Sequence, residues 1–258
     1  IMDEQQIILS LRNIGLSYTR RTGLLRYEKF WALQDVSFDL CHGETLGIIG
    51  KNGVGKSTVL RLIAGIMSPD RGEITRYEPL RASLLALQVG VIPHLTGRQN
   101  AVLGGLLLGL SRTDIEALLP RIIEFSELDE FIDQPVRSYS MGMKARLGFS
   151  VAIHADPDIL LIDEVLGVGD VDFRKKSADA IREISRSNKT VVIVSHNTEL
   201  VRNLCDRVVW IEHGHTQEVG PTDSVLEQYS QSHALTAAGK SQDTGQSGVT
   251  KPELHNLA

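Results

Sequence analysis

The stretch Gly50-Lys51-Asn52-Gly53-Val54-Gly55-Lys56-Ser57-Thr58 decides the fold, because it fits the phosphate-binding pattern G-x-x-x-x-G-K-[ST]. The apolar segment 44–49 precedes it with the pattern of a strand, and the segment 59–64 follows it with the pattern of an amphipathic helix. Glycines let backbone N–H groups turn towards phosphate oxygens, and a helix N-terminus adds partial positive charge. The stretch therefore predicts a strand–loop–helix site for a nucleoside triphosphate.

Two side chains of this loop carry chemistry of their own. We expect Lys56 to reach the β- and γ-phosphates and Ser57 to offer its hydroxyl to Mg²⁺. The residues expected to contact the nucleotide are those of the whole loop: Gly50, Lys51, Asn52, Gly53, Val54, Gly55, Lys56, Ser57 and Thr58.

Composition limits the class of protein. The chain has 258 residues, 42% hydrophobic and 23% charged, which is typical of a globular protein of one large or two small domains. Its net charge of −5 gives no basic footprint for nucleic acid, so we expect no nucleic-acid partner. The longest apolar run, 101–110, is broken by glycines and too short to span a bilayer, and no signal peptide opens the chain. Any membrane role is expected to be peripheral. Cys41 and Cys205 fit neither a metal cluster nor a disulfide framework, which suits a reducing compartment.

Two further segments end in polar residues where a parallel sheet places its ligands. The apolar run 158–163 leads into Asp163 and Glu164, and the run 190–195 leads into His196. We expect Asp163 to hold Mg²⁺ directly or through water, and Glu164 to orient or deprotonate the attacking water. His196 is positioned to donate to the γ-phosphate.

The rest of the chain predicts an α/β protein with an insert. Segments 7–11 and 36–40 alternate like edge strands of an antiparallel hairpin, and a helix is expected over about 172–187. Capping patterns at Thr96-Gly97-Arg98-Gln99 and Ser111-Arg112-Thr113-Asp114 predict a helical insert over about 96–137.

Two segments have no clear place in this pattern. The segment 20–31 combines basic and aromatic residues, and it fits either a solvated loop or a docking surface. From Ser230 the sequence becomes rich in Ser, Gly, Thr and Gln, which predicts a disordered tail over 231–258.

These motifs, in this order, resemble those of the ATP-binding cassette (ABC) ATPases over residues 7–230. Tyr139-Ser140-Met141-Gly142-Met143 resembles the family's Leu-Ser-Gly-Gly-Gln signature, with methionines in place of a Gly and the Gln. The resemblance implies a P-loop NTPase fold with a RecA-like core, an N-terminal antiparallel β subdomain and a helical signature subdomain over about 96–150.

The resemblance also implies a site shared between two copies. In the family, the signature of one subunit contacts the γ-phosphate bound by the other, which assigns that role to Ser140 and Gly142. Asp170 falls in the family's D-loop, Gln88 resembles the residue that senses Mg²⁺ and the water, and Tyr18 resembles the aromatic residue that stacks on adenine, with Tyr27, Phe30 and Trp31 as competitors for the base. A homodimer that binds ATP and Mg²⁺ is therefore expected.

Some departures from the common pattern narrow the resemblance. The runs Tyr-Ser-x-Gly-Met, Asp-Glu-Val-Leu-x-Val-Gly-Asp and Leu-Thr-Gly-Arg-x-Asn look like those of ATPase subunits of bacterial polysaccharide exporters (Wzt-like O-antigen, capsule and teichoic-acid export). This implies a peripheral subunit on the cytoplasmic face of the inner membrane, a multi-span permease present in two copies, and a lipid-linked polysaccharide carried through it. Segment 231–258 is too short for the carbohydrate-binding domain that some relatives carry.

Three other classes of protein share some of these motifs. A cassette acting on DNA or ribosomes fits the acidic balance poorly, and no sustained heptads or second cassette are present. A P-loop kinase or GTPase does not explain the signature or His196. An ATPase subunit of a drug or lipid exporter is a further alternative, and only the motif variants quoted above argue against it.

Overall fold

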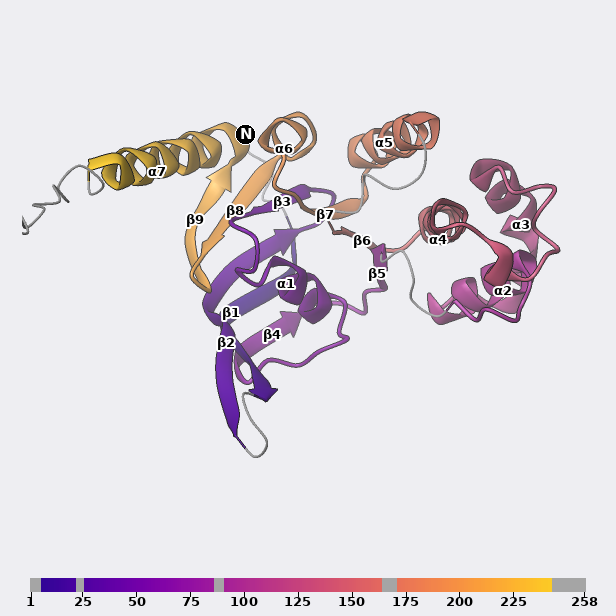
Figure 1. The fold of residues 1–258 in the computed structure, drawn as a ribbon, viewed down its shortest axis with the longest axis horizontal. Helices are drawn as coiled ribbons and strands as arrows, with labels where there is room; N and C mark the ends of the chain where they lie inside the picture. Colours follow the sequence, from indigo (N-terminus) through magenta and orange to yellow (C-terminus); the bar gives the residue numbers. More distant parts are fainter. Residues whose placement is uncertain (1–5, 22–25, 86–90, 164–170, 243–258) are drawn as a thin grey trace, which may run out of the picture.

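The computed structural model describes residues 6–21, 26–85, 91–163 and 171–242, and its centre is a nine-stranded sheet (Figure 1). The strand order is β4-β1-β2-β9-β8-β3-β7-β6-β5. The strands are β1 (Ile7–Arg21), β2 (Tyr27–Cys41), β3 (Thr45–Ile49), β4 (Arg71–Arg76), β5 (Ala82–Leu85), β6 (Ile159–Ile162), β7 (Thr190–Val194), β8 (Arg207–Glu212) and β9 (His215–Pro221).

The predicted buried parallel strands are confirmed. β3 pairs in parallel with β7 and β8, and β6 pairs in parallel with β5 and β7. Every residue of β3, β6 and β7 is buried, because both faces of this part of the sheet are covered. Their carboxyl ends therefore lie along one edge of the sheet.

The N-terminal hairpin is antiparallel as predicted but longer and differently placed. β1 lies between β4 and β2, and β2 lies between β1 and β9, so the expectation that both are edge strands is wrong. The pairing continues through the basic and aromatic segment 20–31 as far as Arg21 opposite Tyr27, so most of this segment is strand rather than loop. Cross-strand pairs such as Tyr18 opposite Phe30 stabilise an extension of this kind.

Two apolar cores cover the two faces of the sheet. On one face α1 (Lys56–Ile63) packs with the antiparallel strands. On the other face lie α5 (Val171–Arg186), α6 (Thr198–Leu204) and the start of α7 (Thr222–Gln242). Alternate residues of β7 divide between them, with Val192 in the first core and Val191 in the second, as the two-residue period of a strand requires.

A third apolar core stabilises the helical lobe. In Figure 1 this lobe lies to the right of β5 and β6, and α1 lies to their left. The lobe contains α2 (Gly97–Leu107), α3 (Arg112–Ser126) and α4 (Met141–His154), with a 3₁₀ turn over Val136–Ser138. The predicted capping box at Thr96 is present, and the Ser111 side chain accepts from the Asp114 N–H at the start of α3. The helical insert is therefore confirmed, and α5 matches the helix expected over 172–187.

The C-terminal prediction is wrong for part of its length. α7 continues to Gln242, well into the segment 231–258 that was expected to be disordered. Val225 and Leu226 are buried against the second core and fix the first turns of the helix. A started helix extends at little cost even through a polar sequence, so low apolar content alone does not predict its end. Residues 243–258 lie outside the described residues.

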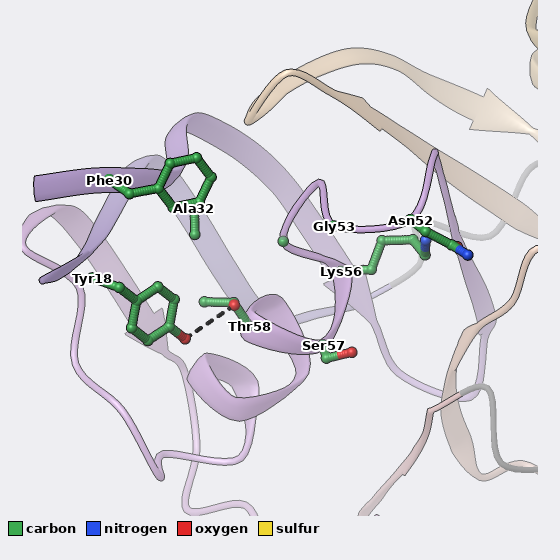
Figure 2. Close-up of a pocket in the computed structure, with 9 residues that line it drawn as sticks. Tyr18, Phe30, Ala32, Asn52, Gly53, Lys56, Ser57 and Thr58 are labelled. Carbon is green, nitrogen blue, oxygen red and sulfur yellow. Dashed lines mark hydrogen bonds between the residues drawn. The ribbon is translucent and has the colours of Figure 1, made fainter. Parts of the chain in front are cut away.

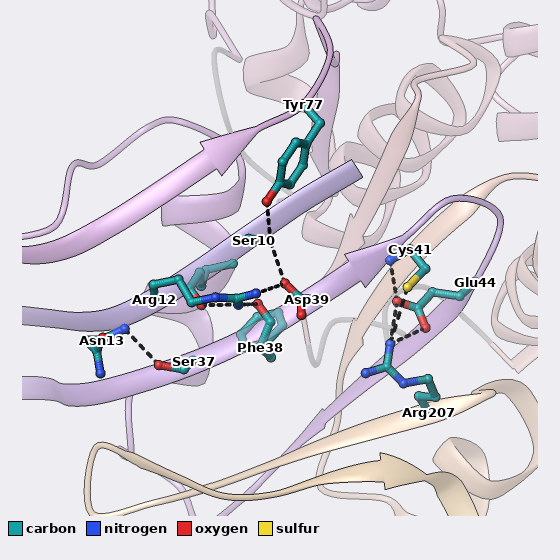
Figure 3. Close-up of polar contacts among 11 residues, drawn as sticks. Ser10, Arg12, Asn13, Ser37, Phe38, Asp39, Cys41, Glu44, Tyr77 and Arg207 are labelled. Atoms are coloured by element: carbon teal, nitrogen blue, oxygen red, sulfur yellow. Dashed lines mark hydrogen bonds and ion pairs between the residues drawn. The ribbon is translucent and has the colours of Figure 1, made fainter. Parts of the chain in front are cut away.

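A buried ion pair joins three strands at the edge of the sheet opposite the carboxyl ends of the parallel strands (Figure 3). The side chain of Glu44, just before β3, is 0% exposed and accepts from the Cys41 N–H at 2.6 Å. Nη1 of Arg207 donates to both of its carboxylate oxygens, at 3.0 and 3.2 Å. Burial raises the pKa of Glu44, while the Cys41 N–H and Arg207 oppose that rise. The contacts connect the ends of β2, β3 and β8.

Candidate nucleotide-binding site

The P-loop connects β3 to α1 and is fitted closely between neighbouring strands. Gly50 has φ 150°, and a Cβ there would lie 2.1 Å from the carbonyl oxygen of Ile211 in β8. Gly55 has φ 97°, and a Cβ there would lie 2.7 Å from the carbonyl oxygen of Ala32 in β2. Both positions require glycine because the loop backbone touches strand backbone on two sides.

The loop and the hairpin together enclose a pocket of about 280 Å³ (Figure 2). Tyr18 from β1 and Phe30 from β2 face it from one side, since their pairing places them on the same face of the hairpin. The Tyr18 hydroxyl lies 3.2 Å from Oγ1 of Thr58, which joins this wall to α1. The lining residues are Tyr18, Phe30, Ala32, Asn52, Gly53, Gly55, Lys56, Ser57 and Thr58.

The structure separates the competing aromatic residues. Tyr18, 37% exposed, and Phe30, 58% exposed, line the pocket, whereas Trp31 points to the opposite face of the hairpin. Its ring lies under Lys29 Nζ at 4.7 Å and Arg71 Cζ at 4.2 Å. The sequence indicated Phe30 as a competitor for the base but gave no signal for Ala32, which reaches the pocket through its place in β2 and not through any local motif.

Lys56 and the start of α1 form the cationic part of the site. Lys56 is 6% exposed, and its Nζ donates to the carbonyl oxygens of Gly50 at 2.8 Å and Lys51 at 3.0 Å. In the described residues no side chain caps α1 at Gly55, and residues 55–58 at the start of this helix line the pocket. This arrangement suits phosphate oxygens.

The predicted strand-end residues lie along the edge that carries the P-loop. Ile48 of β3 is paired with Val194 of β7, and β7 is paired with β6, so the strand ends followed by the P-loop, His196 and Asp163 are adjacent. His196 is exposed and Asp163 is half-buried. Three other predicted site residues, Gln88, Glu164 and Asp170, lie outside the described residues.

The donors at this edge fit a hard divalent cation. Ser57 and Asp163 offer a hydroxyl and a carboxylate, which suit Mg²⁺ when substrate phosphates complete its shell. Among the residues that the structure describes, no group of three or more His, Cys, Asp or Glu side chains could form an all-protein metal cage.

The signature segment begins a helix, as predicted, in the helical lobe. Ser140 is the N-cap of α4, and its hydroxyl accepts from the Met143 N–H at 3.1 Å. The preceding Tyr139 is 5% exposed and donates to the Phe131 carbonyl oxygen at 2.6 Å, which fixes where α4 starts. Ser140 is exposed, and neither it nor Gly142 lines the pocket among the described residues. Within one chain the two halves of the expected site are therefore apart.

The fold and the site define a P-loop nucleotide-binding protein with a helical signature lobe. The family model described as ABC transporter matches residues 33–167, which is more than half of the chain. The chain belongs to this family, and its activity is that of an ABC-type ATPase, the hydrolysis of ATP to ADP and phosphate coupled to transport.

The chain is similar to two relatives in sequence and to one solved structure in fold. The O-antigen export system ATP-binding protein RfbB of Klebsiella pneumoniae is 48% identical over 211 residues, covering 82% of this chain and 85% of the relative. The teichoic acids export ATP-binding protein TagH of Listeria monocytogenes is 45% identical over 204 residues, covering 79% and 60%. A dimeric ATP-binding cassette bound to ADP and Pi has a TM-score of 0.70 at 22% identity, covering 83% of this chain and 99% of that one.

Proposed function

We propose that this chain is the ATPase subunit of an exporter that moves a lipid-linked polysaccharide, O-antigen in the first instance, across the inner membrane. The observation that carries the proposal is the 48% identity to an O-antigen export ATP-binding protein over most of both chains. The similarity to a teichoic acids export protein supports the same substrate class and keeps teichoic acid, with capsule, as the alternative.

The proposed site is completed by a second copy of the chain. Ser140 and Gly142 lie away from the pocket of their own chain, and a helix N-terminus is suited to an anion. In the proposed homodimer these residues reach the γ-phosphate held by the partner's P-loop. The dimeric arrangement of a cassette with the same fold supports this geometry.

The positions of the described residues support the roles proposed for them. Lys56 neutralises phosphate charge, Ser57 and Asp163 hold Mg²⁺, and Tyr18 stacks on the base. His196 donates to the γ-phosphate from the end of β7. Mg²⁺, when bound, supplies charge neutralisation at the phosphates. Of the residues outside the described part, Glu164 is the proposed general base, Gln88 senses Mg²⁺ and water, and Asp170 belongs to the D-loop.

The proposed location is peripheral, on the cytoplasmic face of the inner membrane, with two copies of a multi-span permease as partner. In the part of the chain that the structure describes, none of the helices is long and apolar enough to cross a bilayer. Docking to a permease is the proposed route by which closure of the dimer acts on the polymer.

Complementation tests the substrate class. The gene is expressed in a strain that lacks its O-antigen export ATPase but retains its permease, and surface O-antigen is measured. Restored surface polymer supports the proposal, and the variant Lys56→Ala serves as the inactive control. If surface O-antigen is not restored but the gene rescues a teichoic-acid export mutant, the exported polymer is teichoic acid instead.

The chemical step has its own test. Glu164→Gln is expected to retain ATP binding and dimerisation while hydrolysis falls by about three orders of magnitude. Turnover near that of the unmodified protein would remove Glu164 from the role of general base.

A further inference from the structure

An ion pair fastens the P-loop to the neighbouring strand. Nζ of Lys51 lies 2.8 Å from Oε1 of Glu212, the last residue of β8. The Glu212 side chain is 14% exposed and that of Lys51 is 47% exposed, so the carboxylate is the buried, fixed member of the pair. A partly buried pair with good geometry is screened less by salt than a fully exposed one.

The same lysine touches the catalytic machinery through its backbone. Its carbonyl oxygen accepts from Lys56 Nζ at 3.0 Å, while its side chain reaches away to Glu212. β3 and β8 run in parallel register, with Ile49 opposite Trp210, so the loop leaves β3 directly beside the end of β8. One residue therefore carries both the side-chain contact to β8 and the carbonyl oxygen that accepts from Lys56.

The C-terminal helix contributes to this environment. Tyr229 of α7 stacks edge-on against Trp210 with ring centroids 5.5 Å apart. Burial raises the pKa of Tyr229, Glu212 raises it further, and Lys51 lowers it, which shows that the ring lies within the field of both charges. The ion pair thus lies between the loop and the end of β8, on the strand that packs against α7, with the Lys51 side chain 47% exposed.

We propose that Lys51 and Glu212 are a positioning pair that holds the P-loop in its ATP-binding shape. In the described chain neither residue lines the pocket, so the pair acts through the Lys51 backbone and Lys56 rather than by touching ATP. The inference concerns ATP binding and rests on the proposed nucleotide site, whichever polymer is exported.

The test measures ATP affinity and turnover of the full chain for Glu212→Gln, Lys51→Met and the double variant. Each single variant is expected to weaken ATP binding and raise KM about three- to tenfold, with kcat within about twofold of the unmodified protein. The double variant is expected to be no worse than either single one, because both changes remove the same interaction. Exchange of the two charges, Lys51→Glu with Glu212→Lys, should recover part of the affinity.

A control and a rival outcome make the test decisive. Asp156→Asn breaks another ion pair, Lys189 to Asp156 at 2.8 Å, far from the P-loop, and should leave KM unchanged. If Lys51 instead contacts phosphate directly, Lys51→Met would weaken binding while Glu212→Gln, which frees the lysine, would leave it unchanged or strengthen it, and the inference would be overturned.

Folding and the site itself are checked separately. Thermal unfolding of each variant distinguishes a local effect from general loosening, which would lower kcat together with affinity. Glu212→Asp keeps the charge, and its KM for ATP is expected to lie between those of the unmodified protein and Glu212→Gln. If the unmodified protein fails to bind ATP, the proposed nucleotide site fails; if it binds and Glu212→Gln binds equally well, only the positioning pair fails.

Discussion

Replacing Arg207 with Met isolates the buried charge of Glu44. The carboxylate, 0% exposed, would lose two of its three hydrogen bonds and keep the one from the Cys41 N–H. Removing one partner of a buried pair costs about 3–5 kcal/mol, and the partial exposure of Arg207, 26%, places the expected loss near 3 kcal/mol. Met keeps the length of the apolar stem, so the change reports on charge rather than on a cavity.

The loss should depend on pH with a definite sign. Burial raises the pKa of Glu44 in the folded protein above its ordinary value of 4.5, and removal of Arg207 raises it further. The folded state therefore binds the proton more tightly than the unfolded chain does. The protonated Glu44 side chain contributes to the stability of the fold below the pKa it has in the unfolded chain. This contribution is lost as the pH rises through the pKa it has in the folded protein.

Urea unfolding at pH 7.5 and at about pH 5 measures both effects. The difference in unfolding free energy between Arg207→Met and the unmodified protein should be smaller at the lower pH. Adding Glu44→Gln should recover more than half of the loss at pH 7.5, since a neutral amide oxygen still accepts from Cys41. A loss below about 1 kcal/mol, or one of equal size at both pH values, would refute the reasoning.

Three other predictions concern the site and the thiols. Gly50→Ala places a Cβ against the Ile211 carbonyl oxygen and should lower kcat/KM for ATP about a hundredfold. A Cβ at Gly53 meets nothing within 4 Å, so Gly53→Ala should lower kcat/KM less, and equal losses would contradict this account. Tyr18→Ala should raise KM about tenfold and Tyr18→Phe hardly at all, as measured by steady-state ATPase assays; a comparable rise for Tyr18→Phe would show that the hydroxyl matters more than the ring. Burial raises the pKa of Cys205 to about 12, so only about one thiol in ten thousand is ionised at pH 8 and iodoacetamide should label it after unfolding only; rapid labelling of the folded chain would contradict this burial.

Much of the site could be predicted because its chemistry depends on short patterns. The P-loop, the strand ends before Asp163 and His196, and the N-cap at Ser140 each reside in a few consecutive residues whose period and capping chemistry are local. The three strands that carry the first two features are adjacent in the sheet, and the apolar runs 158–163 and 190–195 predicted that two of them are buried and parallel.

The rest could not be predicted because it depends on register and on distant partners. Whether Tyr18 or Trp31 faces the pocket is decided by a one-residue difference in hairpin pairing, which alternation alone does not reveal. Glu44 and Arg207 are 163 residues apart, and Lys51 and Glu212 are 161 apart. The length of α7 depends on the packing of its first turns, not on the polar composition that follows.

The junction between the two parts of the sheet has a mechanical consequence. β2 meets β9 through a single bridge, Asp35 to His215, with the N–H groups of Gln34 and Asp35 donating to the Gly214 carbonyl oxygen. Side-chain contacts add to this junction, because Gln34 Nε2 donates to the His213 carbonyl oxygen at 3.2 Å and the Ser37 N–H donates to Oγ1 of Thr216 at 3.1 Å. Apolar packing of the first core, which is non-directional, also holds the two parts together. The pocket lies across this junction, with its aromatic wall on one part and its P-loop on the other. A ligand that fills the pocket therefore contacts both parts of the sheet at once and adds a further connection across their junction.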